Sequence, residues 1–401
     1  MRTSERVNKI AASQSLAVAA KAKAMKAEGI DIISMSLGEP DFDTPVHIRR
    51  AAQEAVENGW SHYGPVPGIE SLREAIADSQ NANLTFDIGH LTFEASDVIV
   101  SVGAKMAIYN AIQTVVDPGD EVIIPMPSWV SYSEMVKVAE GIVVPVETRF
   151  EDDYCLTAEQ LRKALSDKTK MLILCSPNNP TGSVYSRAQL EALVEVLKEY
   201  PEVVVLSDEI YNRISYQDSG FRSQESGVTS LAAFPELAER LILVNGVSKA
   251  YAMTGYRIGW LLCKNAEFIK ACIRLQGQQI TCATMVAQRA AEVALTSSQE
   301  CVEQMRQVFA ERRELICGLA AEVPGLKFKE PQGAFYLFPD VSAIGTGDEV
   351  AEMLLEQAHV AVVSGSAFGC PNCIRLSYAI STEEIVEAMR RIKKALTSLS
   401  A

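Results

Sequence analysis

The chain has 401 residues, of which 48% are apolar and 22% charged, a balance typical of a well-packed globular protein rather than a disordered one. Its 51 acidic and 37 basic side chains leave a formal charge of −14, which disfavours binding to nucleic acid or to an anionic lipid surface. The length exceeds that of one ordinary compact core and predicts two domains, while no apolar run reaches the ~18 residues of a membrane span.

The N-terminal segment up to Lys26 is rich in basic residues and serines, and Glu5 is its only acid. Transit peptides share this composition. The favoured interpretation is an N-terminal arm followed by an amphipathic helix, with the cytoplasm as the expected compartment. The apolar residues that share one face of this helix are Leu16, Val18, Ala19 and Ala22.

The middle of the chain alternates short β-branched apolar runs with helix-length segments such as 187–200. Apolar strands without alternation are typical of parallel sheets covered by helices on both faces, so this order predicts an α/β sandwich with right-handed crossovers. After residue 284, long helical patterns and two further strands, at 333–338 and 373–378, predict a smaller α+β domain. The predicted strands of the larger domain are 98–101, 121–125, 171–175, 203–207 and 241–245.

Ligands of such sheets gather at the carboxyl ends of the strands. The first of these ends is a glycine turn within 101–110, where free amides at a helix start can bind a phosphate. Trp129 follows the next strand and offers a flat surface for stacking on a ring, although a half-buried core tryptophan is the more usual interpretation. Asn179 follows the third strand and can donate to a ring oxygen, unless the Pro–Asn loop is plain turn chemistry.

Two charged residues follow the last two strands. Asp208 can pair as a buried carboxylate with a protonated ring nitrogen, such as that of pyridoxal 5′-phosphate, or it can be a surface acid beside Glu209. Lys249 lies where burial lowers the pKa of an amine and frees it to attack an aldehyde. Arg257, eight residues later, offers a planar donor fork for a phosphate. Taken alone, structural ion pairs with acidic side chains explain Lys249 and Arg257 equally well.

The nine cysteines are scattered between Cys155 and Cys373 without a repeated spacing. Only Cys370 and Cys373 form a C-x-x-C, and no second pair or nearby histidine completes a zinc site. This pattern favours reduced thiols in a core or on loops, and no metal is expected.

Taken together, these segments resemble the fold-type I, class I aminotransferases, and within them the bacterial aspartate aminotransferases of the Iβ type. The motifs that carry the resemblance are SLGEPDFDTP, YGPVPGIESLREAI, SPNNPTG, SDEIY, SKAYAMTGYRIGW and IRLSYA, in the order and spacing of the family. The resemblance implies a large domain with a mostly parallel seven-stranded sheet, over 46–284, and a smaller α+β domain over 285–401. Residues 1–45 would form an arm and a segment that joins the small domain.

The same resemblance implies the roles of the residues around a pyridoxal 5′-phosphate cofactor. Lys249 would hold the cofactor covalently and then carry the proton between the substrate and the cofactor. Asp208 would pair with the pyridine nitrogen, Tyr211 and Asn179 with the phenolic oxygen, and Trp129 would stack on the ring.

The phosphate would be held by Arg257 and by the amides of Gly103 and Ala104. Tyr63 would reach the phosphate of a neighbouring subunit, so the active unit would be a homodimer. The chain departs from many relatives three residues before the lysine, where Gly246 replaces a phosphate-binding serine. Ser248 is a candidate for cofactor binding, with the role of its hydroxyl left open.

The substrate would be an amino acid or a 2-oxo acid. Arg375 would bind its α-carboxylate through two parallel hydrogen bonds, with the Gly38 backbone, Asn179 and Trp129 against the same molecule. Lys105, after the phosphate turn, would bind a second carboxylate, although a helix-surface lysine or an extra phosphate charge would explain it too. A cation there favours aspartate, glutamate, oxaloacetate and 2-oxoglutarate, because an apolar side chain would leave it unpaired.

The expected reaction is therefore ping-pong transamination of L-aspartate with 2-oxoglutarate, giving oxaloacetate and L-glutamate. Relatives that use aromatic, alanine or prephenate substrates are the alternative, although AASQSLA departs from the KPSxTLA-like form common in the group. A non-catalytic sensor, a nicotinamide-dependent dehydrogenase and another pyridoxal phosphate reaction are further rivals. The dehydrogenase requires a G-x-G-x-x-G after the first strand, and the sequence contains none there.

Overall fold

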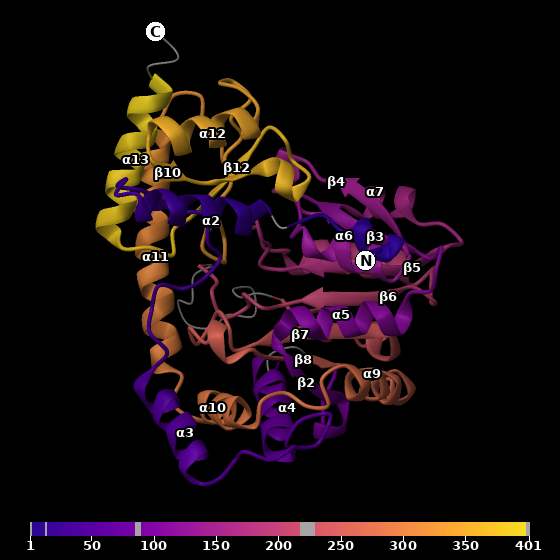
Figure 1. The fold of residues 1–401 in the computed structure, drawn as a ribbon. Helices are drawn as coiled ribbons and strands as arrows, with labels where there is room; N and C mark the ends of the chain where they lie inside the picture. The colour runs from indigo at the N-terminus through magenta and orange to yellow at the C-terminus, as the bar shows by residue number, and fades with distance from the viewer. Residues whose placement is uncertain (1, 13, 85–89, 217–228, 398–401) are drawn as a thin grey trace.

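A computed structural model describes residues 2–12, 14–84, 90–216 and 229–397 (Figure 1). Within these ranges seven strands form the central sheet in the order β2–β8–β7–β6–β5–β3–β4. β8 is antiparallel to both of its neighbours and the other pairs are parallel, which confirms the predicted mostly parallel seven-stranded sheet. The strands are β2 (Val98–Val102), β3 (Glu121–Met126), β4 (Ile142–Glu147), β5 (Thr169–Cys175), β6 (Val204–Asp208), β7 (Leu241–Gly246) and β8 (Ile258–Leu262).

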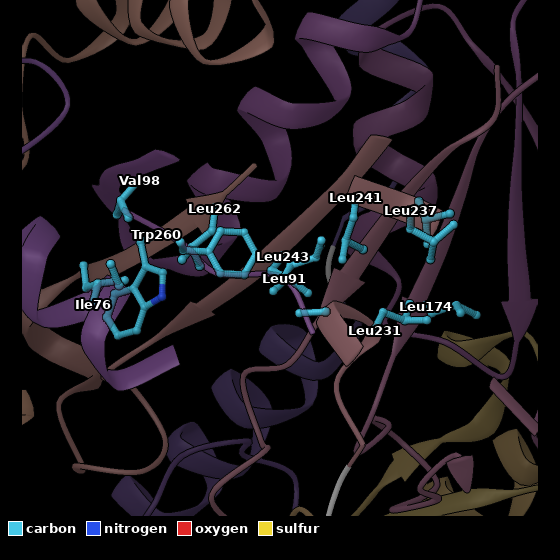
Figure 2. Packing of buried hydrophobic residues seen from close by; sticks show 14 of the residues in the cluster. Ile76, Leu91, Val98, Leu174, Leu231, Leu237, Leu241, Leu243, Trp260 and Leu262 are labelled. Atoms are coloured by element: carbon cyan, nitrogen blue, oxygen red, sulfur yellow. The ribbon is translucent and has the colours of Figure 1, made fainter. Parts of the chain in front are cut away.

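Side chains of the central strands alternate between two apolar cores, one on each face of the sheet. In β5, Leu172 and Leu174 belong to one core and Ile173 to the other. Figure 2 shows part of the first core, where Leu174 lies near Leu231 and Leu243 of β7 points into the same layer. Because both faces are buried, these strands carry runs of consecutive apolar residues, which is the pattern seen in the sequence.

Helices cover both faces of the sheet. One face is covered by α5 (Gly103–Val115), α6 (Ser131–Val138) and α9 (Ala266–Gln279). The other face is covered by α4 (Glu70–Leu84), α7 (Ala158–Ala164), α8 (Arg187–Leu197) and α10 (Met285–Thr296), and α3 (Val46–Glu57) packs on α10. A capping box of Ser186 with Gln189 begins α8 and satisfies backbone N–H groups that have no partner within the helix.

A second apolar core lies apart from the sheet, at the upper left of Figure 1. It is built by three helices, α11 (Glu300–Ala321), α12 (Gly347–Gln357) and α13 (Thr382–Thr397). They pack on the antiparallel strands β9 (Tyr336–Leu337), β11 (Val363–Ser364) and β12 (Ile374–Ser377). The short strand β1 (Ile33–Ser34) pairs in parallel with β10 (Val360–Ala361), so the N-terminal segment joins this second core.

The packing of α10 bears on the proposed boundary between the large and the small domain. Helix α10 lies after the predicted boundary at residue 284, yet Ala287, Ala290 and Ala294 are buried in the core of the large sheet. We therefore propose that the small domain begins after α10.

The N-terminal prediction needs a correction. The first helices are α1 (Glu5–Asn8) and α2 (Gln14–Ala27). Val18 and Ala22 pack on Leu355 as part of one helical face, but Leu16 does not share it and is 67% exposed. Residue 16 lies about half a turn from that face, because each residue of an α-helix turns by roughly 100°. Among the described residues, no helix is both long and apolar enough to cross a bilayer.

Candidate active site

A cavity of about 370 Å³ lies at the carboxyl edge of the central sheet, where loops of the large sheet meet strands of the second core. Residues of both parts line it, from Ser36 and Gly38 near the N-terminus to Arg375 on β12. The lining includes eleven residues singled out in the sequence, namely Gly38, Ala104, Lys105, Trp129, Asn179, Asp208, Tyr211, Ser248, Lys249, Arg257 and Arg375. The strand-end argument placed Trp129, Asn179, Asp208 and Lys249 at one edge of the sheet, and all four line this cavity; the resemblance added Gly38 and Arg375 from the second part of the molecule.

Lys249 follows β7 and its side chain lies inside the cavity. Its Nζ donates to the carbonyl oxygen of Gly38 at 2.5 Å. Burial lowers the pKa of Lys249 to about 8; the carboxylate of Glu39 opposes this shift, and the charges of Arg257 and Arg375 add to it. A buried amine with such a pKa is available as a neutral nucleophile close to neutral pH.

Asp208 ends β6 and is 3% exposed. One carboxylate oxygen accepts from the hydroxyl of Tyr132 at 2.6 Å and the other from the backbone N–H of Ile210 at 3.1 Å. Burial raises the pKa of Asp208, while both hydrogen bonds and the charge of Lys249 oppose that rise. The carboxylate is thus dry, held in one orientation and able to accept from a further cationic donor.

The helix α5 begins at the edge of the cavity beside Arg257. Gly103 has φ +76°, and a Cβ added there would lie 2.4 Å from a terminal nitrogen of the Arg257 guanidinium. The first amides of α5 have no partner within the helix, and together with the helix dipole and Arg257 they form a place for an anion. Gly103 itself does not line the cavity, whereas the next residue, Ala104, does.

The structure explains why glycine, not serine, stands three residues before Lys249. Gly246 pairs with Gly259 between β7 and β8. A Cβ at position 246 would lie 2.9 Å from the Gly259 Cα and 2.9 Å from the Ile258 carbonyl oxygen, too close for any side chain. A Cβ at Gly259 would in turn lie 2.1 Å from the Ala104 amide nitrogen. Gly246 thus lets β7 lie close to β8, Gly259 lets the start of α5 lie directly against the sheet, and Ser248 is the nearby hydroxyl that lines the cavity.

Arg375 of β12 is 3% exposed and is held from both parts of the molecule. One terminal nitrogen donates to Asn179 Oδ1 at 2.8 Å and the other to the Ser36 carbonyl oxygen at 2.7 Å. Its Nε has no hydrogen-bond partner among the described residues. The guanidinium also lies 4.4 Å from the ring centre of Tyr336 and 4.9 Å from that of Phe368. A buried arginine fork fixed in this way suits a carboxylate.

Lys105 and Trp129 both line the cavity and contact each other. The Lys105 Nζ lies 4.7 Å from the centre of the Trp129 ring. Burial, and next the charge of Arg257, lower the pKa of Lys105. A lysine without a carboxylate partner in this position would gain from an anionic group of a ligand.

Sequence reasoning did not single out several residues that line the cavity. Tyr132 bonds to Asp208, and its only signal was its position three residues after Trp129. The hydroxyl of Tyr336 lies 2.8 Å from that of Tyr211, and it would collide with any side chain at Gly38. Other lining residues that the sequence did not indicate as site residues are Ser36, Leu37, Glu39, Ile108, Ser131, Cys175, Ile210, Thr254 and Leu16, which was expected only as part of a helical face.

Tyr63, like Gly103, is a predicted site residue that does not line the cavity. Its side chain is 88% exposed, so its predicted role depends on a second subunit. The described part of the chain contains no group of three or more His, Cys, Asp or Glu side chains that could hold a metal ion.

Comparison with known proteins gives a consistent result. A model of the family described as Aminotransferase class I and II matches residues 30–392. The chain is 42% identical to the aspartate aminotransferase of Bacillus sp. (strain YM-2), over 97% of both chains. It is 41% identical to the aspartate/prephenate aminotransferase of Nitrosomonas europaea, over 99% of this chain and 100% of the relative. A solved structure of the Thermus thermophilus aspartate aminotransferase with maleate superimposes with a TM-score of 0.91 at 40% identity, covering 99% of this chain and 100% of that one.

We predict that Lys249 of the cofactor-free protein reacts with a small amine-directed reagent along a titration curve centred near pH 8. Because the pKa is lowered, the neutral amine increases from about one tenth at pH 7 to about nine tenths at pH 9, whereas a model-peptide lysine titrates near pH 10.4. Mass spectrometry of the labelled peptide measures the rate. Glu39→Gln removes the carboxylate that favours the cation, so its midpoint should be lower still. A wild-type midpoint above pH 10 would contradict the desolvation argument.

Proposed function

The chain belongs to the class I and II aminotransferases, and on this premise we propose that it transfers the amino group of L-aspartate to 2-oxoglutarate. The products are oxaloacetate and L-glutamate. The observation that carries the proposal is one cavity that contains a low-pKa amine, a buried carboxylate and two separate cations suited to carboxylates, at Arg375 and Lys105.

The donor set of the cavity fits pyridoxal 5′-phosphate as the cofactor. The amides of Gly103 and Ala104 with Arg257 match a phosphate, Asp208 matches a protonated pyridine nitrogen, and Lys249 matches an aldehyde. When bound, this cofactor supplies an aldehyde for the amine and a ring that accepts electrons from the α-carbon of the substrate.

The proposed roles of the neighbouring residues follow from their contacts. Asp208, oriented by Tyr132, keeps a proton on the ring nitrogen, because a buried carboxylate without that proton partner is costly. Tyr211 and Asn179 bind the ring oxygen, Trp129 stacks on the ring and Ser248 is a further hydroxyl beside the cofactor.

Lys249 is the proposed proton carrier between the substrate and the cofactor. Its lowered pKa makes it a base near neutral pH, and the same amine can return the proton at the neighbouring carbon. Gly38 lies directly next to Lys249, because the Gly38 carbonyl oxygen accepts a hydrogen bond from the Lys249 Nζ. This contact connects the substrate end of the cavity with the proton carrier.

Substrate orientation is the proposed role of the two remaining cations. Arg375 binds the α-carboxylate and Lys105 the second carboxylate, so that a four-carbon or five-carbon dicarboxylic acid is held at both ends. Maleate, with which the Thermus thermophilus relative was solved, is a dicarboxylate of the same length as aspartate. Two anchors fix the bond to be broken relative to the cofactor and exclude water from the region between them.

A homodimer is proposed as the active unit. Val46 and Val56 of α3 are more than half exposed and line a groove of about 630 Å³ together with Tyr256 and Val286. Tyr256 directly precedes the phosphate-binding Arg257, so a second subunit seated in this groove lies next to the phosphate end of the cavity. The exposed Tyr63 of that subunit is the proposed donor to the phosphate. The scattered cysteines support a reducing compartment, the cytoplasm, which cell fractionation would test.

The purified protein is expected to turn aspartate and 2-oxoglutarate into oxaloacetate and glutamate in equal amounts, measured by a coupled assay. Lys249→Ala removes the base and the covalent attachment, so turnover should fall roughly 10⁴-fold or more, and the yellow chromophore should be lost. Lys270→Ala, on the exposed side of α9, is the matched control and should keep full activity. Near-normal turnover in Lys249→Ala would exclude the proposed reaction path.

Specificity for dicarboxylic substrates is tested by Lys105→Met, which keeps the length of the side chain and removes its charge. We expect kcat/KM for aspartate to fall about 10- to 100-fold, whereas alanine and phenylalanine should change by less than about threefold. The control is Lys270→Met. An assay with prephenate distinguishes the two activities named among the relatives, aspartate aminotransferase and aspartate/prephenate aminotransferase. Equal losses for all amino donors would mean that Lys105 does not contact the second carboxylate.

The dimer is tested by sedimentation velocity of the purified protein, which should give twice the mass of one chain. Tyr63→Phe removes one hydroxyl bond to a charged phosphate, so cofactor affinity should fall about tenfold without a change in sedimentation. Fluorescence titration with pyridoxal 5′-phosphate measures the affinity. A monomer, or unchanged affinity in Tyr63→Phe, would refute the proposed contribution of the neighbouring subunit.

A further inference from the structure

Two cysteines lie close together at one end of the strand that carries Arg375. The sulfurs of Cys370 and Cys373 are 3.1 Å apart. The backbone N–H of Cys373 donates to the Cys370 carbonyl oxygen at 3.1 Å, which closes a four-residue turn through Pro371 and Asn372. Such a turn brings its end Cα atoms within about 7 Å, close to the spacing found in disulfides. The two sulfurs need to approach by only about 1 Å to bond.

The two thiols differ in exposure. Cys370 is partly exposed, whereas Cys373 is 1% exposed. Proton sharing with Cys373 lowers the pKa of Cys370, against the opposing effects of burial and of the Asp340 and Glu147 charges. The hydrogen bond to Cys370 and burial raise the pKa of Cys373. The accessible sulfur is therefore the better nucleophile, and its buried neighbour is in position to react second.

We propose that Cys370 and Cys373 form a redox-sensitive dithiol, which a low-molecular-weight disulfide oxidises to an intramolecular disulfide. The Cys370 thiolate attacks one sulfur of the small disulfide, forms a mixed disulfide and releases the first small thiolate. That thiolate takes the proton of Cys373, whose sulfur then attacks the Cys370 sulfur and releases the second small thiolate, which takes up the proton that Cys370 had lost. Two cysteine thiols thus lose two electrons, and one small disulfide is reduced to two thiols.

Cys373 belongs to a small apolar cluster between the two parts of the molecule. We call it the Cys373 cluster, and its buried members are Tyr154, Phe338, Val363, Ala367, Phe368 and Cys373. Tyr154 follows β4 of the large sheet, and its hydroxyl lies 3.8 Å from the Cys373 sulfur. The other members belong to the second core, so the cluster joins the two parts.

Phe368 connects the Cys373 cluster with Arg375. Its ring lies 4.9 Å from the Arg375 guanidinium carbon, and its chain position is two residues before Cys370. Val363, another member, is the partner of Arg375 in the pairing of β11 with β12. The Cys373 carbonyl is tightly packed, because a Cβ at Gly347 would lie 2.1 Å from its oxygen and one at Gly365 would lie 2.5 Å away. Formation of the disulfide must therefore move Cys370 or side chains of the Cys373 cluster. Phe368 is two residues from Cys370 and belongs to the cluster, so either movement affects it.

Oxidation is accordingly coupled to substrate binding through the support of Arg375. This part rests on the proposed role of Arg375 as the α-carboxylate ligand. The disulfide should weaken binding of a dicarboxylate and raise KM for aspartate about threefold or more, with a smaller change in kcat, because the proton carrier Lys249 is not part of the cluster.

The test uses the full-length, cofactor-loaded enzyme, equilibrated in mixtures of glutathione and glutathione disulfide and then alkylated. Both cysteines lie on one tryptic peptide, residues 330–375, which contains no other cysteine. The expected result is loss of both alkyl groups and of two hydrogens in that peptide at oxidising mixtures, reversed by dithiothreitol. A peptide that stays fully alkylated at the most oxidising mixture would overturn the dithiol proposal, whatever the activity of the enzyme.

The dissociation constant of maleate and the KM for aspartate are measured on the same samples. Cys370→Ser and Cys373→Ser should remove the response to glutathione disulfide, and Cys301→Ser, at a partly exposed cysteine of α11, should keep it. A disulfide that leaves both constants unchanged would overturn the coupling to Arg375. Failure of the reduced enzyme to transaminate would instead overturn the proposed function and leave the peptide measurement intact.

Discussion

The fold of this protein has to hold several charged side chains close together around one cavity. A chain with a formal charge of −14 gathers four cationic side chains, Lys105, Lys249, Arg257 and Arg375, around one cavity that contains the carboxylates of Asp208 and Glu39. Cations taken out of water repel one another and lose hydration, and both effects appear in the lowered pKa values of the two lysines. Anionic ligands stabilise such an arrangement, and a phosphate and two carboxylates are the ligands that the proposed function supplies. The fold can therefore be understood as the scaffold that holds these charges together.

Local sequence patterns predicted the site residues that lie at the ends of strands. Asp208 and Lys249 each follow a buried apolar strand, and parallel strands bring their carboxyl ends to one edge, so local pattern was enough to predict their proximity. Tyr336 could not be found in this way, because it enters from a two-residue strand of the second core. The strands β4 and β8 were not predicted either. β4 is a half-exposed edge strand with a proline, and β8 contains Gly259, features that weaken a strand signal.

Resemblance to a family supplied what local patterns could not, namely which cation binds which ligand. Even so, the environment of each residue belongs to this chain. Asn179 Oδ1 is occupied by Arg375, and the Tyr211 hydroxyl is shared with Tyr336, so the groups proposed to bind cofactor and substrate also bind one another. These contacts cross between the large sheet and the second core. A ligand that competes for these hydrogen bonds changes the strength of the contact between the large sheet and the second core. Ligand binding can therefore shift the relative position of the two parts.

The glycine pair at the β7–β8 ladder has a consequence for how this protein can vary. Positions 246 and 259 touch each other, and position 259 touches the amide of residue 104, so the three form a chain of contacts with no free space. A side chain at 246 would meet the Gly259 Cα, the Ile258 carbonyl oxygen and the Ile210 side chain, so β7 and β8 would have to separate at this point. Because residue 259 also contacts the amide of residue 104, such a separation would reach the amides at the start of α5 through the ladder. A serine at 246 in this chain would therefore need accompanying changes in β8.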